Sequence, residues 1–320
     1  MFLKKKKQYI IAVYKYLNRM DFSLRIDTKN KLLKRIKIAL YRTIISFVKI
    51  FKKDEGDILK AFWLKRTQNF GDSLNPILLN ELSGKPVQWI KSYSPEMHYI
   101  TIGSILESAT KDTIVWGVGF ISEESHCFEK PKKVCAVRGP KSRNKLIEDG
   151  IACPEVYGDP ALLLPKFYSP SVKKTHKLGI IPHFVDKALP WFNTIKQNDE
   201  VKIIDIQNPD IFAFIDEVLS CEKIVSSSLH GIIISDAYRI PSLWAEFSKG
   251  VIGDGFKFLD YFLSVGRKDH SPYIISESTN IKELFEQFHE YEIQIDLQKL
   301  TDHAPFHIKD KYKNGGLIKN

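Results

Sequence analysis

The chain has 320 residues, of which 43% are hydrophobic, so it is long enough for two domains with separate cores. Its net charge of +10 is unevenly placed: residues 1–53 hold 16 Lys and Arg against 2 Asp, and residues 54–320 sum to −4. A mildly acidic body argues against a nucleic-acid-binding protein. Four cysteines without a C-x-x-C pair favour reduced cytosolic thiols over a zinc site or a disulfide framework.

The basic N-terminal segment predicts an amphipathic helix within residues 29–57. Its apolar side consists of Leu33, Ile36, Leu40, Ile44, Phe47, Val48 and Phe51. Arg42 and Lys49 interrupt the only run that approaches the length of a membrane span. Such a helix can lie on an anionic membrane surface, or pack on its own domain with solvated lysines. The lysine density exceeds what packing requires, so we expect residues 1–53 to bind a membrane surface or a partner.

From residue 58 onwards, short apolar runs alternate with helical segments, which predicts an α/β fold with parallel sheets. The first series has strands in 58–64, 98–103, 113–120 and 134–139, with helices in 73–84 and 140–150. The second has strands in 177–183, 201–206, 222–227 and 241–246, with helices in 209–221 and 229–238. A proline-rich stretch near 165–177 predicts the boundary between them. We expect an appendage at 1–55, domains at 56–170 and 171–300, and a tail at 301–320.

Polar residues follow one strand of the second series, at the sheet edge where α/β proteins bind ligands. In the stretch SSSLHG, Ser226, Ser227, Ser228 and His230 lie between a strand and a helix. The free N–H groups of such a helix favour an anion. The structural alternative is that Ser228 is only an N-cap and His230 a satisfied core histidine.

Other polar residues fall at equivalent positions in both series. Asn69, Asp72 and Asn75 form a polar turn into a helix, where Asp72 or the next serine can also be a cap. Arg138 follows a strand, where arginine can grip a carboxylate or phosphate bidentately or form a surface ion pair. His183 ends the first strand of the second series.

Asp159 is interpreted differently from these residues. It precedes a proline in the stretch GDPALLLP, and a structural turn is the better interpretation.

Seven motifs occur in an order that resembles the polysaccharide pyruvyl transferase family, in particular the branch that adds pyruvate ketals to bacterial exopolysaccharides such as succinoglycan. The motifs are NFGDSLN, WGVGF, VRGPKS, YGDPALLLP, IPHFVD, SSSLHGIIISDAYRIPSLW and KFLDYFLSVGR. They run from about Trp63 to Arg267, so the resemblance leaves out the appendage and the tail.

The resemblance implies a GT-B-like fold of two Rossmann-type domains, with the acceptor side at 56–170 and the donor side at 171–300. It implies that the enolpyruvyl group of phosphoenolpyruvate is transferred to two hydroxyls of a lipid-linked sugar, closing a ketal and releasing phosphate. Phosphoenolpyruvate is then a donor substrate, and no metal or other cofactor is expected.

The resemblance also implies roles for individual residues. His230 and Asp72 are expected to be catalytic, and Asn69 and Asn75 to bind the acceptor. The expected donor-binding residues are Arg138, Ser226, Ser227, Ser228, His183 and Lys257. Many relatives have arginine at the position of Ser228, so Arg138, Lys257 or Arg239 has to supply the missing charge.

A pyruvyltransferase of this kind is expected in the cytoplasm, at the inner face of the membrane, where anionic lipid attracts the basic segment and the lipid-linked oligosaccharide resides. Two alternatives remain. One is a glycosyltransferase that uses a nucleotide sugar on the same scaffold. The other is a non-catalytic, membrane-associated capsule-assembly protein. The presence of His230, Arg138 and Asp72 together favours the transferase.

Overall fold

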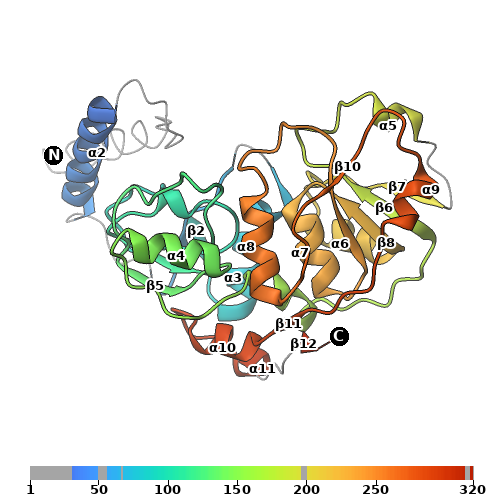
Figure 1. The fold of residues 1–320 in the computed structure, drawn as a ribbon. Helices are drawn as coiled ribbons and strands as arrows, with labels where there is room; N and C mark the ends of the chain where they lie inside the picture. The colour runs from blue at the N-terminus through green and yellow to red at the C-terminus, as the bar shows by residue number, and fades with distance from the viewer. Residues whose placement is uncertain (1–30, 50–55, 66–67, 196–199, 314–317, 320) are drawn as a thin grey trace, which may run out of the picture.

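Two five-stranded parallel sheets form the body of the protein, as the computed structural model shows (Figure 1). The structure describes residues 31–49, 56–65, 68–195, 200–313 and 318–319. The predicted α/β class with two parallel sheets is confirmed, whereas the GT-B-like arrangement stays a prediction. The first 30 residues of the predicted appendage lie outside the described residues.

The first sheet has the strand order β2-β1-β3-β4-β5. Its strands are β1 (Leu59–Ala61), β2 (Val87–Trp89), β3 (His98–Ile100), β4 (Thr113–Trp116) and β5 (Lys133–Ala136). The associated helices are α3 (Phe70–Ser83), η2 (Leu106–Ser108), α4 (Pro140–Glu148) and η3 (Pro160–Lys166). As predicted, α4 begins at a proline, and α3 ends at Gly84, which has the left-handed φ of +76°.

The second sheet has the order β10-β9-β8-β6-β7. Its strands are β6 (His176–Ile181), β7 (Val201–Ile203), β8 (Cys221–Ser226), β9 (Ser242–Glu246) and β10 (Tyr273–Ile274). Its helices are α5 (Trp191–Thr194), α6 (Ile211–Leu219), α7 (Leu229–Ala237), α8 (Phe256–Val265) and α9 (Ile281–Glu286). The strands expected in the second series all form, because continuous apolar runs such as residues 178–181 are buried on both faces of a parallel sheet.

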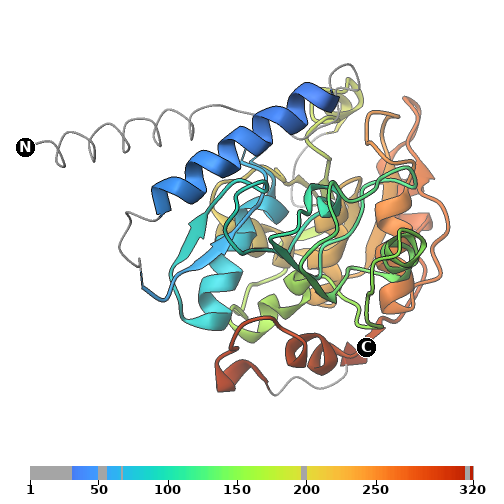
Figure 2. The same ribbon diagram turned by 90° about the vertical axis from the view of Figure 1, so that its left-hand side faces the viewer.

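The C-terminal segment returns to the first sheet. It contains β11 (Gln294–Ile295), α10 (Leu297–Asp302), α11 (Asp310–Lys313) and β12 (Ile318–Lys319). The indole Nε1 of Trp116 donates a hydrogen bond of 3.0 Å to the carbonyl of Leu300, and Tyr312 is buried. Figure 2 shows α10 and α11 on the opposite side of the molecule from α2 (Lys31–Lys49). The segment predicted as a tail therefore forms part of the packed body.

Helix α2 packs on the first domain through a side that the sequence analysis did not identify. Ile38, Tyr41 and Ile45 are buried and form a small cluster with Tyr93 and the half-buried Phe128. Three of the residues named as the apolar side face outward instead: the exposed fractions of Ile36, Leu40 and Phe47 are 47%, 59% and 58%. The helix thus has one apolar side that packs and a second that is exposed.

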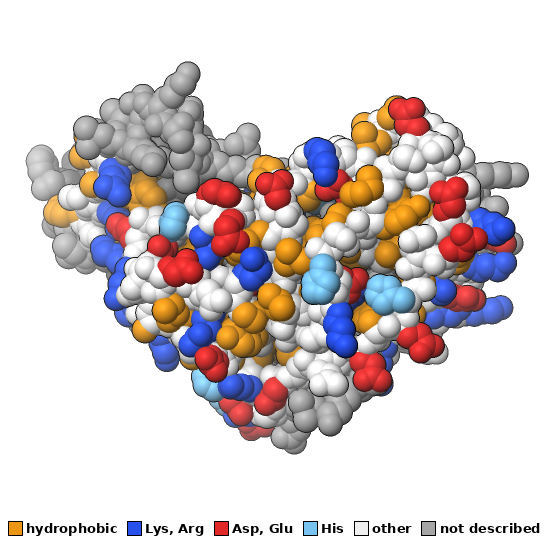
Figure 3. All heavy atoms as spheres, viewed as in Figure 1, with side chains coloured by type: hydrophobic (Ala, Val, Ile, Leu, Met, Phe, Trp, Pro, Cys, Tyr) orange, Lys and Arg blue, Asp and Glu red, His pale blue; other side chains and the backbone are white. Residues whose placement is uncertain are grey.

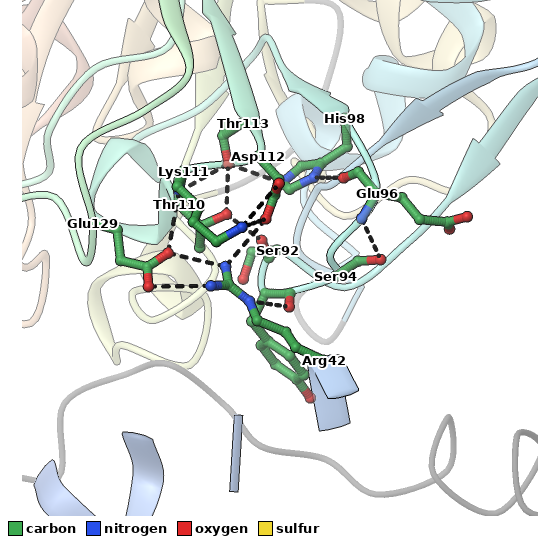
Figure 4. A network of polar contacts seen from close by, with 11 residues as sticks. Arg42, Ser92, Ser94, Glu96, His98, Thr110, Lys111, Asp112, Thr113 and Glu129 are labelled. Carbon is green, nitrogen blue, oxygen red and sulfur yellow. Dashed lines mark hydrogen bonds and ion pairs between the residues drawn. The ribbon is translucent and has the colours of Figure 1, made fainter. Parts of the chain in front are cut away.

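Arg42 fixes this contact through polar interactions (Figure 4). Its guanidinium donates two hydrogen bonds, of 3.1 and 2.9 Å, to the carboxylate of Glu129, and a third, of 3.1 Å, to the carbonyl of Tyr93. The carboxylate of Asp112 lies 3.6 Å away. Arg42, which the sequence analysis named as an interruption of the longest apolar run, thus anchors the helix to its own domain.

Candidate active site

The two halves of the protein meet at helices whose N-termini converge. The backbone N–H of Phe70, at the start of α3, donates to the carbonyl of Ile206 from the second half, at 2.9 Å. The ring of Phe70 packs on that of Phe214 from α6, with centroids 4.5 Å apart. On the face seen in Figure 3, histidine, Lys and Arg side chains gather near the middle of the molecule.

His230 lies at the centre of this junction. It is in the first turn of α7, and only 6% of its surface is exposed. Its imidazole rests on the backbone of Gly71 in α3, so closely that a Cβ atom at Gly71 would overlap the ring. A motif from each half therefore contributes to one contact, and the motif NFGDSLN requires glycine because the ring occupies the place of a side chain.

Asp159 faces His230 from a third element. Its carboxylate Oδ2 lies 3.8 Å from His230 Nε2, and neither atom has a hydrogen-bond partner among the described residues. The other oxygen, Oδ1, accepts the backbone N–H of Ala161 at 2.9 Å and caps η3. The interpretation as a structural turn describes only this half of the carboxylate. In the structure Tyr157 pairs with Val137 in a parallel bridge, which puts Asp159 at the same sheet edge as the other motifs.

Burial sets the protonation of these groups. Burial, followed by the nearby charges of Arg138 and Lys257, lowers the pKa of His230 to about 3. Burial raises the pKa of Asp159 to about 7, against the opposing effects of the Ala161 N–H and Arg138. Burial and then Lys257 lower the pKa of His183 to about 3. Near neutral pH, His230 and His183 are thus neutral bases, while Asp159 is partly protonated.

Arg138 is fully buried in an ion pair, which is not the surface pair that a lone arginine suggested. Its Nε lies 3.0 Å from Oδ2 of Asp260 in α8, and its two Nη atoms donate to Ser104 Oγ and the Phe120 carbonyl, each at 2.6 Å. Asp260 also accepts the backbone N–H and the hydroxyl of Ser142 in α4, at 2.8 and 2.7 Å. Arg138 joins the two halves and contributes its positive charge to His230, and donor binding by Arg138 stays a prediction.

The three serines of the motif SSSLHG differ in their contacts. Ser226 Oγ accepts the N–H of Ser228 and donates to the Ile181 carbonyl, at 3.0 and 2.9 Å. Ser227 Oγ accepts the N–H of His183 at 2.8 Å and donates to the carboxylate of Asp186 at 2.7 Å. Both hydroxyls shape the end of the strand. Ser228 is the N-cap residue of α7, as expected, but its side chain makes no capping hydrogen bond.

The predicted acceptor residues lie on either side of the first turn of α3: Asn69 is the N-cap before the helix begins at Phe70, and Asn75 lies in the second turn. The cap is Asn69, whose side chain accepts the N–H of Gly71 at 3.4 Å, and not Asp72 or the next serine. Asp72 is 7% exposed. Asn75 is fully buried, and its Oδ1 accepts the Thr101 hydroxyl at 2.7 Å. Asn75 thus ties α3 to the end of β3.

Of the charges proposed to replace the missing arginine at Ser228, the structure excludes Arg239. This residue follows the C-cap of α7, and nine helical residues separate it from the end that carries His230, about 13 Å along the helix axis. Lys257 is buried at the start of α8, and its charge acts on both His183 and His230. Among the described residues, Arg138 and Lys257 are therefore the positive charges that act on His230.

Three other features of the described part of the chain bear on the predictions. No group of three or more His, Cys, Asp or Glu side chains there is arranged to hold a metal ion. None of the described helices is both long and apolar enough to span a bilayer. The four cysteines are free thiols, and burial raises the pKa of Cys127 and of Cys153 to about 12.

Comparison with known proteins identifies related sequences. An uncharacterized protein, L143, of Acanthamoeba polyphaga mimivirus is 34% identical over 209 residues, which cover 62% of this chain and 71% of that protein. The succinoglycan biosynthesis protein ExoV of Rhizobium meliloti (strain 1021) is 27% identical over 214 residues, which cover 64% of each chain. No solved structure matches. The family model for polysaccharide pyruvyl transferases matches residues 8–246, which includes most of the N-terminal segment that the motifs had left out. The chain belongs to the polysaccharide pyruvyl transferase family.

Proposed function

We propose that the protein transfers the enolpyruvyl group of phosphoenolpyruvate to two hydroxyls of a sugar in a lipid-linked exopolysaccharide or capsule repeat unit. The product is a pyruvate ketal, and phosphate is released. Family membership supports pyruvyl transfer. The relative from Rhizobium meliloti, which is named for succinoglycan biosynthesis, supports an exopolysaccharide acceptor.

The observation that carries the proposal is the position of His230, which lies on Gly71 between two helix N-termini from opposite halves. The donor has a carboxylate and a phosphate, and helix N-termini favour anions. Arg138 and Lys257 add positive charge at the same place. The reaction also needs a group that passes protons on, and the imidazole of His230, which is neutral near pH 7, can hold a proton transiently.

Two measurements on the full chain test this function. The first is a thermal-shift titration with phosphoenolpyruvate, beside UDP- and GDP-sugars. A ligand at a hundred times its dissociation constant stabilises by about 2.7 kcal/mol, a readily measured shift. We expect a shift with phosphoenolpyruvate that is lost in His230→Ala. A shift only with nucleotide sugars would identify a glycosyltransferase, and no shift with any of them would favour a non-catalytic protein.

The second measurement follows the product. The protein is incubated with phosphoenolpyruvate and nitrophenyl glycosides of glucose, galactose and mannose, and the glycosides are analysed by mass spectrometry. Ketal formation adds the mass of pyruvate less one water and releases one phosphate per glycoside. Phosphate release without the mass increase would indicate hydrolysis of phosphoenolpyruvate and would count against transfer.

We also propose that the exposed side of α2 lies on an anionic membrane surface, holding the enzyme near a lipid-linked acceptor at the inner face of the cytoplasmic membrane. Three large apolar side chains on this side are about half exposed: Ile36, Leu40 and Phe47. The basic segment 1–53 carries a net +14, which complements anionic headgroups. Because Arg42 anchors the helix to the body, such binding would fix the orientation of the whole enzyme.

A further inference from the structure

Two of the buried polar atoms without hydrogen-bond partners in the described part of the chain face each other: Asp159 Oδ2 and His230 Nε2. Leaving a buried polar atom unpaired costs about 1–3 kcal/mol, so such a pair has to be explained. Capping η3 does not explain it, because Oδ1 alone accepts the Ala161 N–H. A neutral asparagine could supply the same cap, so the second oxygen is free for another task.

We infer that Asp159 and His230 act as one proton-exchange pair in the transfer reaction, with Asp159 holding a proton that passes through the imidazole. The inference rests on the proposed function. Asp159 is a positioning residue that acts through His230 Nε2. The remaining 6% exposure of His230 belongs to atoms other than Nε2, which is fully buried, so another edge of the ring is the one that a substrate can reach.

The reaction needs a group that both gives and takes a proton. When the first sugar hydroxyl oxygen bonds to C2 of phosphoenolpyruvate, the methylene C3 gains a proton and the hydroxyl loses one. The bond from C2 to the phosphate oxygen then breaks, and the second hydroxyl oxygen bonds to C2 and loses its proton. Of the two hydroxyl protons, one ends on C3 and one on phosphate. If the Asp159–His230 pair donates a proton to C3 and then takes one from the first hydroxyl, the pair returns to its starting protonation state.

The charges around the pair suit this exchange. Arg138 acts on both members, and Lys257 acts on His230, so the imidazole is neutral at rest and readily gives up a proton that it has received. Asp159, with a pKa of about 7, is protonated in part of the molecules at neutral pH. The separation of 3.8 Å is longer than a hydrogen bond, so the two atoms must approach by about 1 Å when substrate binds, as catalytic hydrogen bonds often do.

The first test compares Asp159→Asn with wild type in the glycoside assay. General acid–base catalysis contributes about 10²- to 10⁴-fold, so we expect kcat to fall by that factor while KM for phosphoenolpyruvate stays within about threefold. The double variant Asp159→Asn/His230→Gln should be no slower than His230→Gln alone. In wild type, kcat should fall as pH rises through about 7, where Asp159 loses its proton, and Asp159→Asn should lack this fall.

A matched control is Asp210→Asn, which makes the same change at the N-cap of α6, away from His230, and should leave kcat unchanged. An Asp159→Asn variant with wild-type kcat, or rate losses that add in the double variant, would reduce Asp159 to a structural cap.

A second measurement needs no substrate. In the full chain labelled with ¹⁵N-histidine, the imidazole signals of His230, assigned by their loss in His230→Gln, should shift with a midpoint near pH 7 in wild type but not in Asp159→Asn. Signals that do not move across that range overturn the pairing. The signals of His230 can shift near pH 7 while the protein transfers no pyruvyl group. That result would contradict both the proposed function and the catalytic role of the pair, but it would confirm the contact between the two residues.

Discussion

Arg138 and Asp260 form a fully buried ion pair across the junction between the two halves, with Arg138 Nε 3.0 Å from Asp260 Oδ2. Asp260 lies in α8 and also binds the N-terminus of α4 through Ser142. The backbones are in contact here as well, because a Cβ atom at Gly139 would overlap the carbonyl of Asp260. One carboxylate therefore connects an arginine, a helix N-terminus and the opposite half of the protein.

Replacing Asp260 should strongly destabilise the protein. Asp260→Ala leaves the Arg138 charge buried without its counter-ion, which costs about 3–5 kcal/mol in buried pairs. The free energy of unfolding, measured by urea denaturation, tests this. Glu200→Gln is the control, because it breaks the exposed pair with Lys177 and should cost less than about 1 kcal/mol. Equal losses of unfolding free energy in the two variants would mean that the buried ion pair contributes no more to stability than the exposed one.

Gly71→Ala should remove activity by displacing His230. The new methyl group would overlap the imidazole, so the ring has to move or the two halves have to separate. We expect kcat for pyruvyl transfer to fall at least about 100-fold, with a loss of 1–3 kcal/mol in stability. In the background His230→Ala, the same substitution should cost much less stability, because the overlapping ring is gone. A loss of equal size in both backgrounds would show that the strain arises elsewhere.

Asp159→Asn should stabilise the protein at high pH. The pKa of Asp159 rises from an ordinary 3.8 to about 7 on folding, so the folded state holds this proton more tightly than the unfolded chain. The carboxyl group therefore favours folding below about pH 4 and opposes it increasingly as pH rises to about 7. Above pH 7, Asp159→Asn should be more stable than wild type by up to about 4 kcal/mol, and the difference should vanish near pH 4.

Unfolding curves of both proteins between pH 4 and 8 measure this difference directly. A gain that is the same at every pH would show that burial of the charge is not its cause.

Leu40→Glu should weaken membrane binding without unfolding α2, because Leu40 is 59% exposed. Burying a leucine contributes about 1.5–3 kcal/mol, so affinity for vesicles containing phosphatidylglycerol should fall at least about tenfold in co-sedimentation. The control is Leu263→Glu, which changes a leucine of similar exposure, 56%, on α8. Binding of wild type should also weaken as salt rises. Wild-type binding by Leu40→Glu, or no binding by any protein, would contradict the membrane proposal.

The sequence predicted the sheets better than it predicted the contacts between them. Continuous apolar runs identified four strands of the second sheet, β6 to β9, whereas the two-residue β10 and the half-buried, three-residue β2 were not predicted. The motifs located His230 and Gly71, but the contact between the imidazole and the glycine joins residues 159 positions apart and depends on how the halves pack. Asp159 was interpreted as part of a turn because an aspartate that caps a helix and an aspartate at a binding site look alike in sequence. In the structure only one oxygen of its carboxylate accepts the capping hydrogen bond.

The side of α2 that packs was missed for a related reason. Hydrophobic periodicity identifies an apolar stripe, and this helix has two. The stripe with leucine and phenylalanine is the more apolar, yet the buried one includes Tyr41, which packs edge-on against Tyr93 with centroids 5.1 Å apart. The buried side of α2 packs on a surface of the first domain that is rich in aromatic and acidic groups. The sequence of the helix itself gives no information about that surface.

The return of the C-terminal segment to the first sheet limits how the two halves can move. The chain crosses between them once after η3 and again between α9 and α10: Leu284 lies in a core cluster of the second half, and Leu300 lies in the cluster that spans both halves. This second covalent connection restricts how far the two halves can separate, and α10 stays attached to the first sheet through the hydrogen bond from the Trp116 indole to the Leu300 carbonyl.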